Sequence, residues 1–94
     1  MLDITRNENG DIILSGRFDA SQVEKAKGIF ASVNGSTKID FEKLEYISSA
    51  GLGVLLMTQK RLTALQHRLT LTRMNSHIRE VFKYAGFDTI FDIE

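Results

Sequence analysis

The chain has 94 residues, of which 43% are hydrophobic and 26% are charged. We therefore expect one folded domain over residues 1–94, because this length and balance leave no room for a second core and exclude a disordered tail. The 12 Lys and Arg residues balance the 12 Asp and Glu residues, and a net charge of zero disfavours a nucleic-acid or anionic-membrane partner. The absence of cysteine excludes disulfides and thiolate metal sites.

The first residues do not resemble a targeting signal. Residues 1–6 lack the basic start and apolar run of a signal peptide. No stretch approaches the roughly 18 apolar residues of a membrane-spanning helix. We therefore expect a cytoplasmic protein with no membrane partner.

The first elements in chain order are two short strands. Residues 2–4 and 12–14 alternate between apolar and polar, as half-buried strands do. The pair Asn9-Gly10 between them is a strong hairpin signal, and Gly16 is expected to close the second strand.

A helix is expected next, because Asp19 and Gln22 have the spacing of a capping box. Asn34-Gly35 is expected to end this helix in a left-handed cap. The apolar residues of one helical face follow the box: Val23, Ala26, Phe30 and Val33.

The middle of the chain predicts a short strand, Thr37–Phe41, a loop over Glu42–Ile47, and a long helix that starts at the two serines and reaches about Gln66. Ser48 or Ser49 is expected to cap the helix. The expected core residues of this helix are Leu52, Leu55, Leu56, Leu62 and Leu65.

The last elements are a fourth strand over residues 69–72, a third helix capped by Asn75 or Ser76 and stopped by Gly86, and a tail over Phe87–Glu94 that packs as a short strand or turn. The third helix is expected to bury Ile78, Val81, Phe82 and Ala85. Strands separated by helices favour parallel pairing, and the opening hairpin adds an antiparallel edge. The predicted fold is α/β, with a mixed, mostly parallel sheet of four or five strands, an N-terminal hairpin and helices packed on it.

The residues that could carry catalysis do not converge. His67 and His77 have no metal-ligand spacing, and the aspartates are scattered. No Lys-Ser/Thr pair follows Gly51-Leu52-Gly53, as a phosphate-binding loop requires. We therefore expect a binding protein with no metal or cofactor of its own, and not an enzyme.

The start of the long helix is unusual in composition. Capping explains one of its two serines but not Gly51 and Gly53, because glycine inside a helix costs about 0.5–1 kcal/mol relative to alanine. The glycines are expected to leave the helix start bare, so that the backbone of another protein can approach it.

The segment from Tyr46 to Val54, with Asp40-Phe41 before it and Gly16-Arg17-Phe18-Asp19 earlier in the chain, resembles the signature of STAS domains, specifically bacterial anti-sigma-factor antagonists. The resemblance covers nearly the whole chain. It implies that Ser49, two residues before the first glycine of Gly51-Leu52-Gly53, is phosphorylated by a partner kinase. Ser48 occupies a position that is often Asp in that family.

The function that the resemblance implies is a phosphorylation-switched antagonist. Unphosphorylated, it would bind a serine-kinase anti-sigma factor and free the sigma factor; a metal-dependent serine phosphatase would reverse the phosphorylation. Val54 and Met57 are expected to be exposed, because leucines fill the inward face of the helix. The expected binding surface comprises Ser48, Ser49, Gly51, Gly53, Val54, Met57 and Arg61, with Asp19 and Asp40 in support. The alternative is a constitutive STAS subunit of a transport or signalling assembly, without a phospho-switch.

Overall fold

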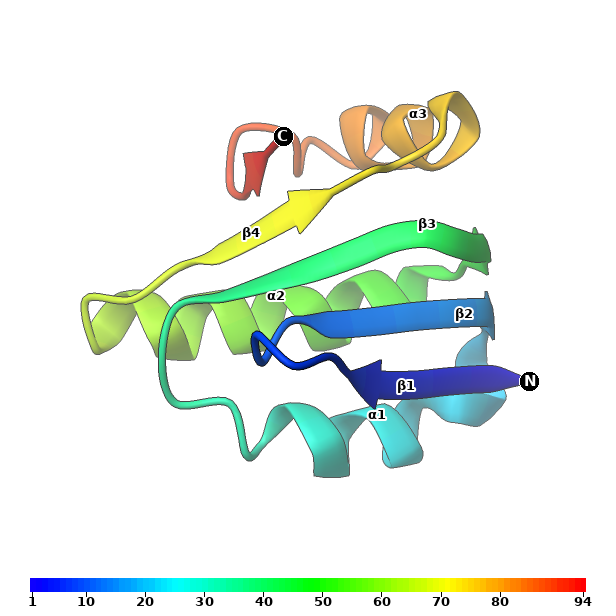
Figure 1. Ribbon diagram of the computed structural model, residues 1–94. Coiled ribbons are helices and arrows are strands. Elements are labelled where there is room, and N and C mark those ends of the chain that lie inside the picture. The colour runs from blue at the N-terminus through cyan, green and yellow to red at the C-terminus, as the bar shows by residue number, and fades with distance from the viewer.

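The computed structural model describes residues 1–94 as a five-stranded mixed sheet with helices on one face (Figure 1). The strands lie side by side in chain order: β1 (Leu2–Arg6), β2 (Ile12–Phe18), β3 (Thr37–Ile47), β4 (Leu69–Thr72) and β5 (Asp92–Ile93). The β1–β2 hairpin is antiparallel and every other pair is parallel. A 3₁₀ turn, η1 (Ala20–Gln22), precedes α1 (Val23–Phe30), and the other helices are α2 (Ser49–Ala64) and α3 (Ser76–Tyr84). This confirms the predicted fold class.

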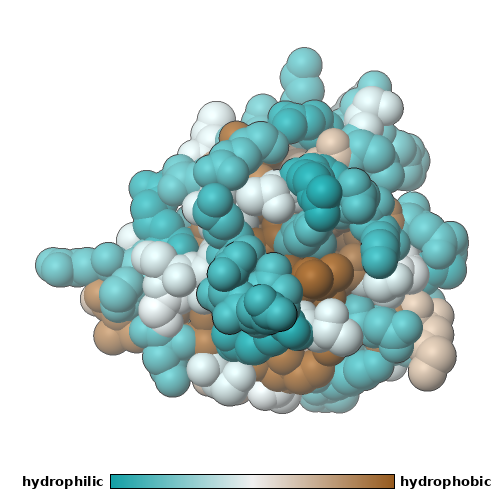
Figure 2. Space-filling view, in the orientation of Figure 1, coloured by the Kyte–Doolittle hydropathy of each residue, from teal (hydrophilic) through white to brown (hydrophobic).

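The sheet buries one face and leaves the other without a helix. Figure 1 shows α1 and α2 behind the strands. The apolar residues of neighbouring strands are in register on the buried face, where Ile12 pairs with Ile39 and Ile39 with Leu71. The ring of Phe82 in α3 packs edge-on against Phe41 of β3, with the ring centroids 5.9 Å apart. In the same orientation, Figure 2 shows a surface dominated by hydrophilic residues.

The expected loop over Glu42–Ile47 is wrong, because β3 runs without interruption to Ile47. The apolar side chains that face the core after Phe41 are spaced by three residues, at Leu44 and Ile47. Two register shifts against β2 produce this spacing by inserting extra residues into β3. Such bulges break the two-residue alternation by which a strand is recognised in sequence. The second half of β3 therefore has the sequence pattern of a loop.

Gly16 does not close β2, which continues to Phe18. It has a φ of +95°, and a Cβ atom at this position would lie 2.3 Å from the carbonyl oxygen of Met1. The backbone N–H of Arg17 donates to the same oxygen over 2.9 Å. Gly16 thus lets Met1, directly before β1, approach closely, and β2 continues through Gly16 instead of ending there.

The first helix ends four residues earlier than expected. Asp19 caps η1 by accepting from the N–H of Ser21, whereas the Gln22 amide oxygen accepts from Leu2 N–H and does not complete a capping box. The helix stops at Phe30, whose carbonyl accepts hydrogen bonds from Val33 N–H and from a side chain of α2. The carbonyl is thus satisfied without the left-handed glycine cap that was expected at residue 35.

The later elements follow the prediction, but three residues expected in the core lie outside it: Leu56, which is only half-buried, Leu65 and Ala85. Asn75 caps α3 by accepting from Ile78 N–H, and Gly86, with a φ of +75°, follows its end. Leu65 is 51% exposed because α2 ends before it, and Ala85 is exposed one residue beyond the last turn of α3.

Candidate partner-binding site

The start of α2 is fixed by Ser48. Its hydroxyl oxygen accepts a hydrogen bond from Gly51 N–H over 3.1 Å, and its own N–H donates to the carbonyl of Phe18 over 2.9 Å. Ser48 is therefore the N-cap, and it ties the first turn of α2 to the end of β2. Serine and aspartate are comparably good N-caps, so Ser48 performs the capping that an aspartate would perform at this position.

Ser49 differs from its neighbour in exposure. It is the first residue of α2 and is exposed, whereas Ser48 is half-buried. Ser49 borders a shallow depression of about 490 Å³ between the start of α2 and α3. Of the two hydroxyls, that of Ser49 is the more accessible to a partner.

The two glycines of α2 have different surroundings. Gly51 is buried, and a Cβ atom there would lie 3.0 Å from side-chain atoms of both Phe18 and Ile47. Its small size therefore serves the packing of α2 on the sheet. Gly53 is half-buried and a Cβ atom there would meet nothing within 4 Å. Only Gly53 leaves backbone bare toward the outside, so the expectation of two bare glycines holds for one of them.

The expected exposed stripe along α2 is narrower than predicted. Met57 is 62% exposed and follows Gly53 on the outer face. Val54 is only 4% exposed and belongs to the core, which corrects the expectation for this residue. The reason is that α1 packs beside α2, so that the inward face extends past the leucines to Val54. Arg61 is half-buried and donates to the carbonyl of Phe30 over 2.8 Å.

The two supporting aspartates lie in different places. Asp19 directly follows Phe18, whose carbonyl accepts the hydrogen bond that holds the start of α2. The hydroxyl of Ser21 donates a hydrogen bond to the carboxylate of Asp19 and thereby lowers the pKa of Asp19. Asp40 instead accepts from Arg73 over 2.5 Å and from the N–H of Glu42 over 2.9 Å. These hydrogen bonds, that of Arg73 above all, lower the pKa of Asp40. Asp40 thus links β3 to the segment after β4.

Sequence reasoning missed the residues of α3 that face Ser49. His77, Glu80 and Tyr84 line the same depression as Ser49, and Tyr84 is 94% exposed. An aromatic residue on the polar face of a helix is the signal that could have drawn attention to this surface. The structure contains no group of three or more His, Cys, Asp or Glu residues placed to hold a metal ion. None of its helices has the length and hydrophobicity needed to span a bilayer.

The fold is that of a small α/β domain whose second helix begins at an exposed serine. A family model described as "Mlab, STAS domain" matches residues 3–92, and the chain belongs to this STAS family. A Bordetella bronchiseptica protein provisionally named anti-sigma factor antagonist BtrV is 46% identical over 55 residues, which cover 58% of this chain and 47% of that relative. The match thus spans about half of BtrV. The anti-sigma-B factor antagonist of Listeria monocytogenes is 28% identical over 88 residues, or 89% of this chain and 77% of the relative.

Solved structures share the fold at low sequence identity. Unphosphorylated SpoIIAA, an anti-sigma factor antagonist, has a TM-score of 0.70 at 20% identity, with 100% of this chain and 87% of that chain covered. The phosphorylated form of Bacillus SpoIIAA has a TM-score of 0.71 at 19% identity, with coverage of 100% and 91%. A Thermotoga maritima structure has a TM-score of 0.80 at 17% identity, with coverage of 99% and 85%.

Proposed function

We propose that this STAS domain is an anti-sigma-factor antagonist that is switched by phosphorylation of Ser49. Unphosphorylated, it binds a serine-kinase anti-sigma factor and frees the sigma factor. The kinase then phosphorylates Ser49 and ends binding, and a metal-dependent serine phosphatase restores it. The observation that carries the proposal is the exposed hydroxyl of Ser49 in the first turn of α2, directly after a serine whose hydroxyl is engaged in capping.

The first turn of a helix tolerates a phosphate well. A phosphoserine carries about −1.5 to −2 charges at neutral pH. Free backbone N–H groups and the helix dipole favour an anion at this end of α2. Phosphorylation should therefore leave the fold intact. Phosphorylation then acts on the complex: it prevents the partner protein from packing against Ser49 and the bare backbone of Gly53.

The size of the effect follows from burial of the phosphate in the complex. Burying a charged group without a partner costs several kcal/mol, and about 1.4 kcal/mol weakens binding tenfold. We expect phosphorylation to lower the affinity for the kinase anti-sigma factor by about two orders of magnitude or more. The circular dichroism spectrum and the melting temperature should change little.

Three variants test the proposal against the cognate kinase anti-sigma factor. Ser49→Ala should bind it and resist phosphorylation, and Ser49→Asp should bind weakly. Ser48→Ala is the matched control and should still be phosphorylated at Ser49. If Ser49→Ala is phosphorylated at the wild-type rate, the phosphorylated residue is not Ser49. Binding without modification of either serine would favour a constitutive STAS subunit.

A further inference from the structure

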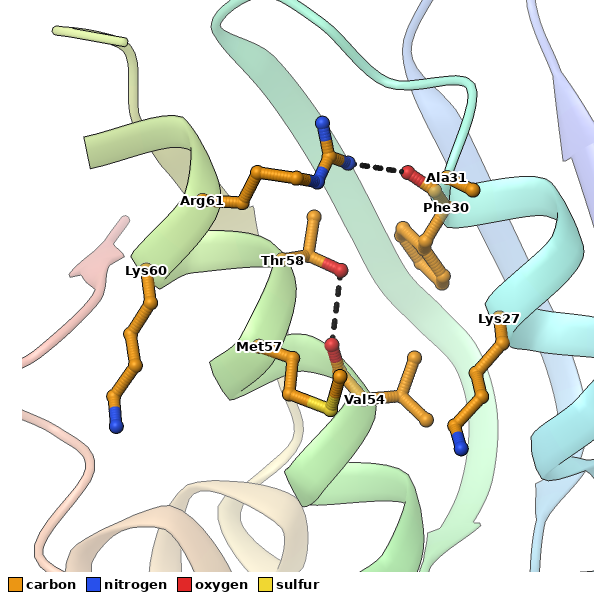
Figure 3. Close-up of a pocket in the computed structure, with 8 residues that line it drawn as sticks. All are labelled: Lys27, Phe30, Ala31, Val54, Met57, Thr58, Lys60 and Arg61. Carbon is orange, nitrogen blue, oxygen red and sulfur yellow. Dashed lines mark hydrogen bonds between the residues drawn. The ribbon is translucent and has the colours of Figure 1, made fainter. Parts of the chain in front are cut away.

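We propose that the groove between α1 and α2 docks an acidic amphipathic helix of the partner protein. The groove has a volume of about 420 Å³ and an apolar floor. Phe30 of α1 and Val54 of α2 are buried beneath it, and the exposed side chain of Met57 borders it (Figure 3). The hydroxyl of Thr58 donates to the carbonyl of Val54 over 2.9 Å. Its hydrogen bond is therefore made within α2, and the hydroxyl does not make the floor of the groove polar.

Three positive side chains surround this floor. Lys27 of α1 and Lys60 of α2 lie on either side of Met57, and Arg61 lies beyond it near the end of α1 (Figure 3). None of the three has a carboxylate within 4.0 Å, as is true of most Lys and Arg residues of this chain, but these three gather around one groove that no acidic residue lines. In a chain of zero net charge, three unpaired cations around an apolar groove indicate a negatively charged occupant.

Arg61 is held in place for such an occupant. Its guanidinium donates to the carbonyl of Phe30 over 2.8 Å and to the side-chain oxygen of Asn34 over 3.4 Å. A guanidinium has five N–H donors, so donors remain for an incoming carboxylate. Because the side chain is already ordered, less conformational entropy is lost when that carboxylate binds.

The shape of the groove favours a helix as occupant. The groove follows α2 from Val54 to Arg61, about 10 Å or two helical turns. A short amphipathic helix laid between α1 and α2 would place its apolar stripe on the floor and acidic residues along both edges of the stripe, opposite Lys27 and Lys60. Met57 and Arg61 also belong to the partner-binding surface, so this inference rests on the proposed function and names the chemistry of the partner's contacting segment.

The probes are three designed peptides of about 15 residues, each with one leucine stripe flanked by Glu, Gln or Lys. Each peptide is titrated into the isotopically labelled domain and followed by backbone amide shifts. The Glu-flanked peptide should shift residues 30–31 and 54–61 and bind at least about tenfold more tightly than the Gln-flanked peptide. The double variant Lys27→Glu/Lys60→Glu should lose this preference, and the matched control Lys43→Glu/Lys83→Glu, on β3 and α3, should keep it.

Three results would overturn the inference. The first is equal affinity for the Glu- and Gln-flanked peptides, and the second is amide shifts confined to other surfaces. The third would assign the groove to lipid: the domain binds phosphatidylglycerol vesicles, the double variant does not, and the Glu-flanked peptide causes no shift. The peptide titration does not involve the anti-sigma factor. The peptide titration can therefore refute the docking groove while Ser49-dependent binding of the kinase is confirmed. If instead the phosphorylation switch is refuted, the titration still tests the groove.

Discussion

The contrast between Gly51 and Gly53 gives a prediction with opposite signs two residues apart. Alanine at Gly51 would place a Cβ atom 3.0 Å from atoms of Phe18 and Ile47, whose side chains are 0% and 4% exposed and cannot move aside. Such overpacking costs about 1–3 kcal/mol, against a gain of about 0.5–1 kcal/mol in helix propensity. Gly51→Ala should therefore lower the free energy of unfolding by up to about 2 kcal/mol. Gly53→Ala meets open space and should raise it by about 0.5–1 kcal/mol.

Urea unfolding and thermal melting measure both effects. In a domain of this size, 1 kcal/mol shifts the melting temperature by about 4–8 °C, so the two variants should separate clearly on either side of the wild type. Gly53→Ala should also weaken binding of the anti-sigma factor despite its greater stability, because the added methyl group would lie on the proposed contact surface. Equal stability of the two variants would refute the packing argument. Wild-type binding by Gly53→Ala would remove Gly53 from the interface.

Four further substitutions test other parts of the structure. Met57→Glu should abolish binding of the anti-sigma factor but change stability by no more than about 0.5 kcal/mol, because the side chain is 62% exposed; a collapsed melting transition would place Met57 in the core. Leu55→Ala and Phe82→Ala should each cost about 2–5 kcal/mol in urea unfolding without changing partner choice, since both side chains are fully buried; near-wild-type unfolding would contradict this packing. Hydrogen bonds from Arg73 lower the pKa of Asp40 in the folded state below its ordinary value of 3.8. The stability that ionised Asp40 contributes is therefore present above pH 3.8 and is lost as the pH falls through the pKa of the folded state. Asp40→Asn should thus be less stable than wild type by about 1 kcal/mol or less at pH 7, with the difference shrinking below about pH 4, and a constant difference across that range would argue against the ion pair.

The order of the elements could be predicted from the sequence because most of them carry local signals. The hairpin turn before β2, the caps of α2 and α3, and Gly86 after α3 all depend on residues close in the chain. The second half of β3 could not be predicted, because its two bulges are set by pairing with β2, far away in sequence. Local pattern and tertiary pairing disagree there, and the pairing determines the structure.

Some features of the candidate site could likewise be predicted from the sequence, and others could not. Exposure of Ser49 and Met57 follows from their place on α2 and was predictable from helical periodicity. The burial of Val54 was not, because it depends on where α1 packs. The same packing places Lys27 and Lys60 around one groove, and two lysines on separate helices give no motif in the sequence.

The central claim, that Ser49 is the residue at which partner binding is switched, is tested most directly by mapping phosphorylation on the chain purified from its native host. Peptide mass spectrometry across growth conditions should find one phosphate, on Ser49, in part of the population and none on Ser48. Phosphate on Ser48 with Ser49 unmodified would contradict the assignment. A chain that is never phosphorylated on either serine would contradict the switch itself.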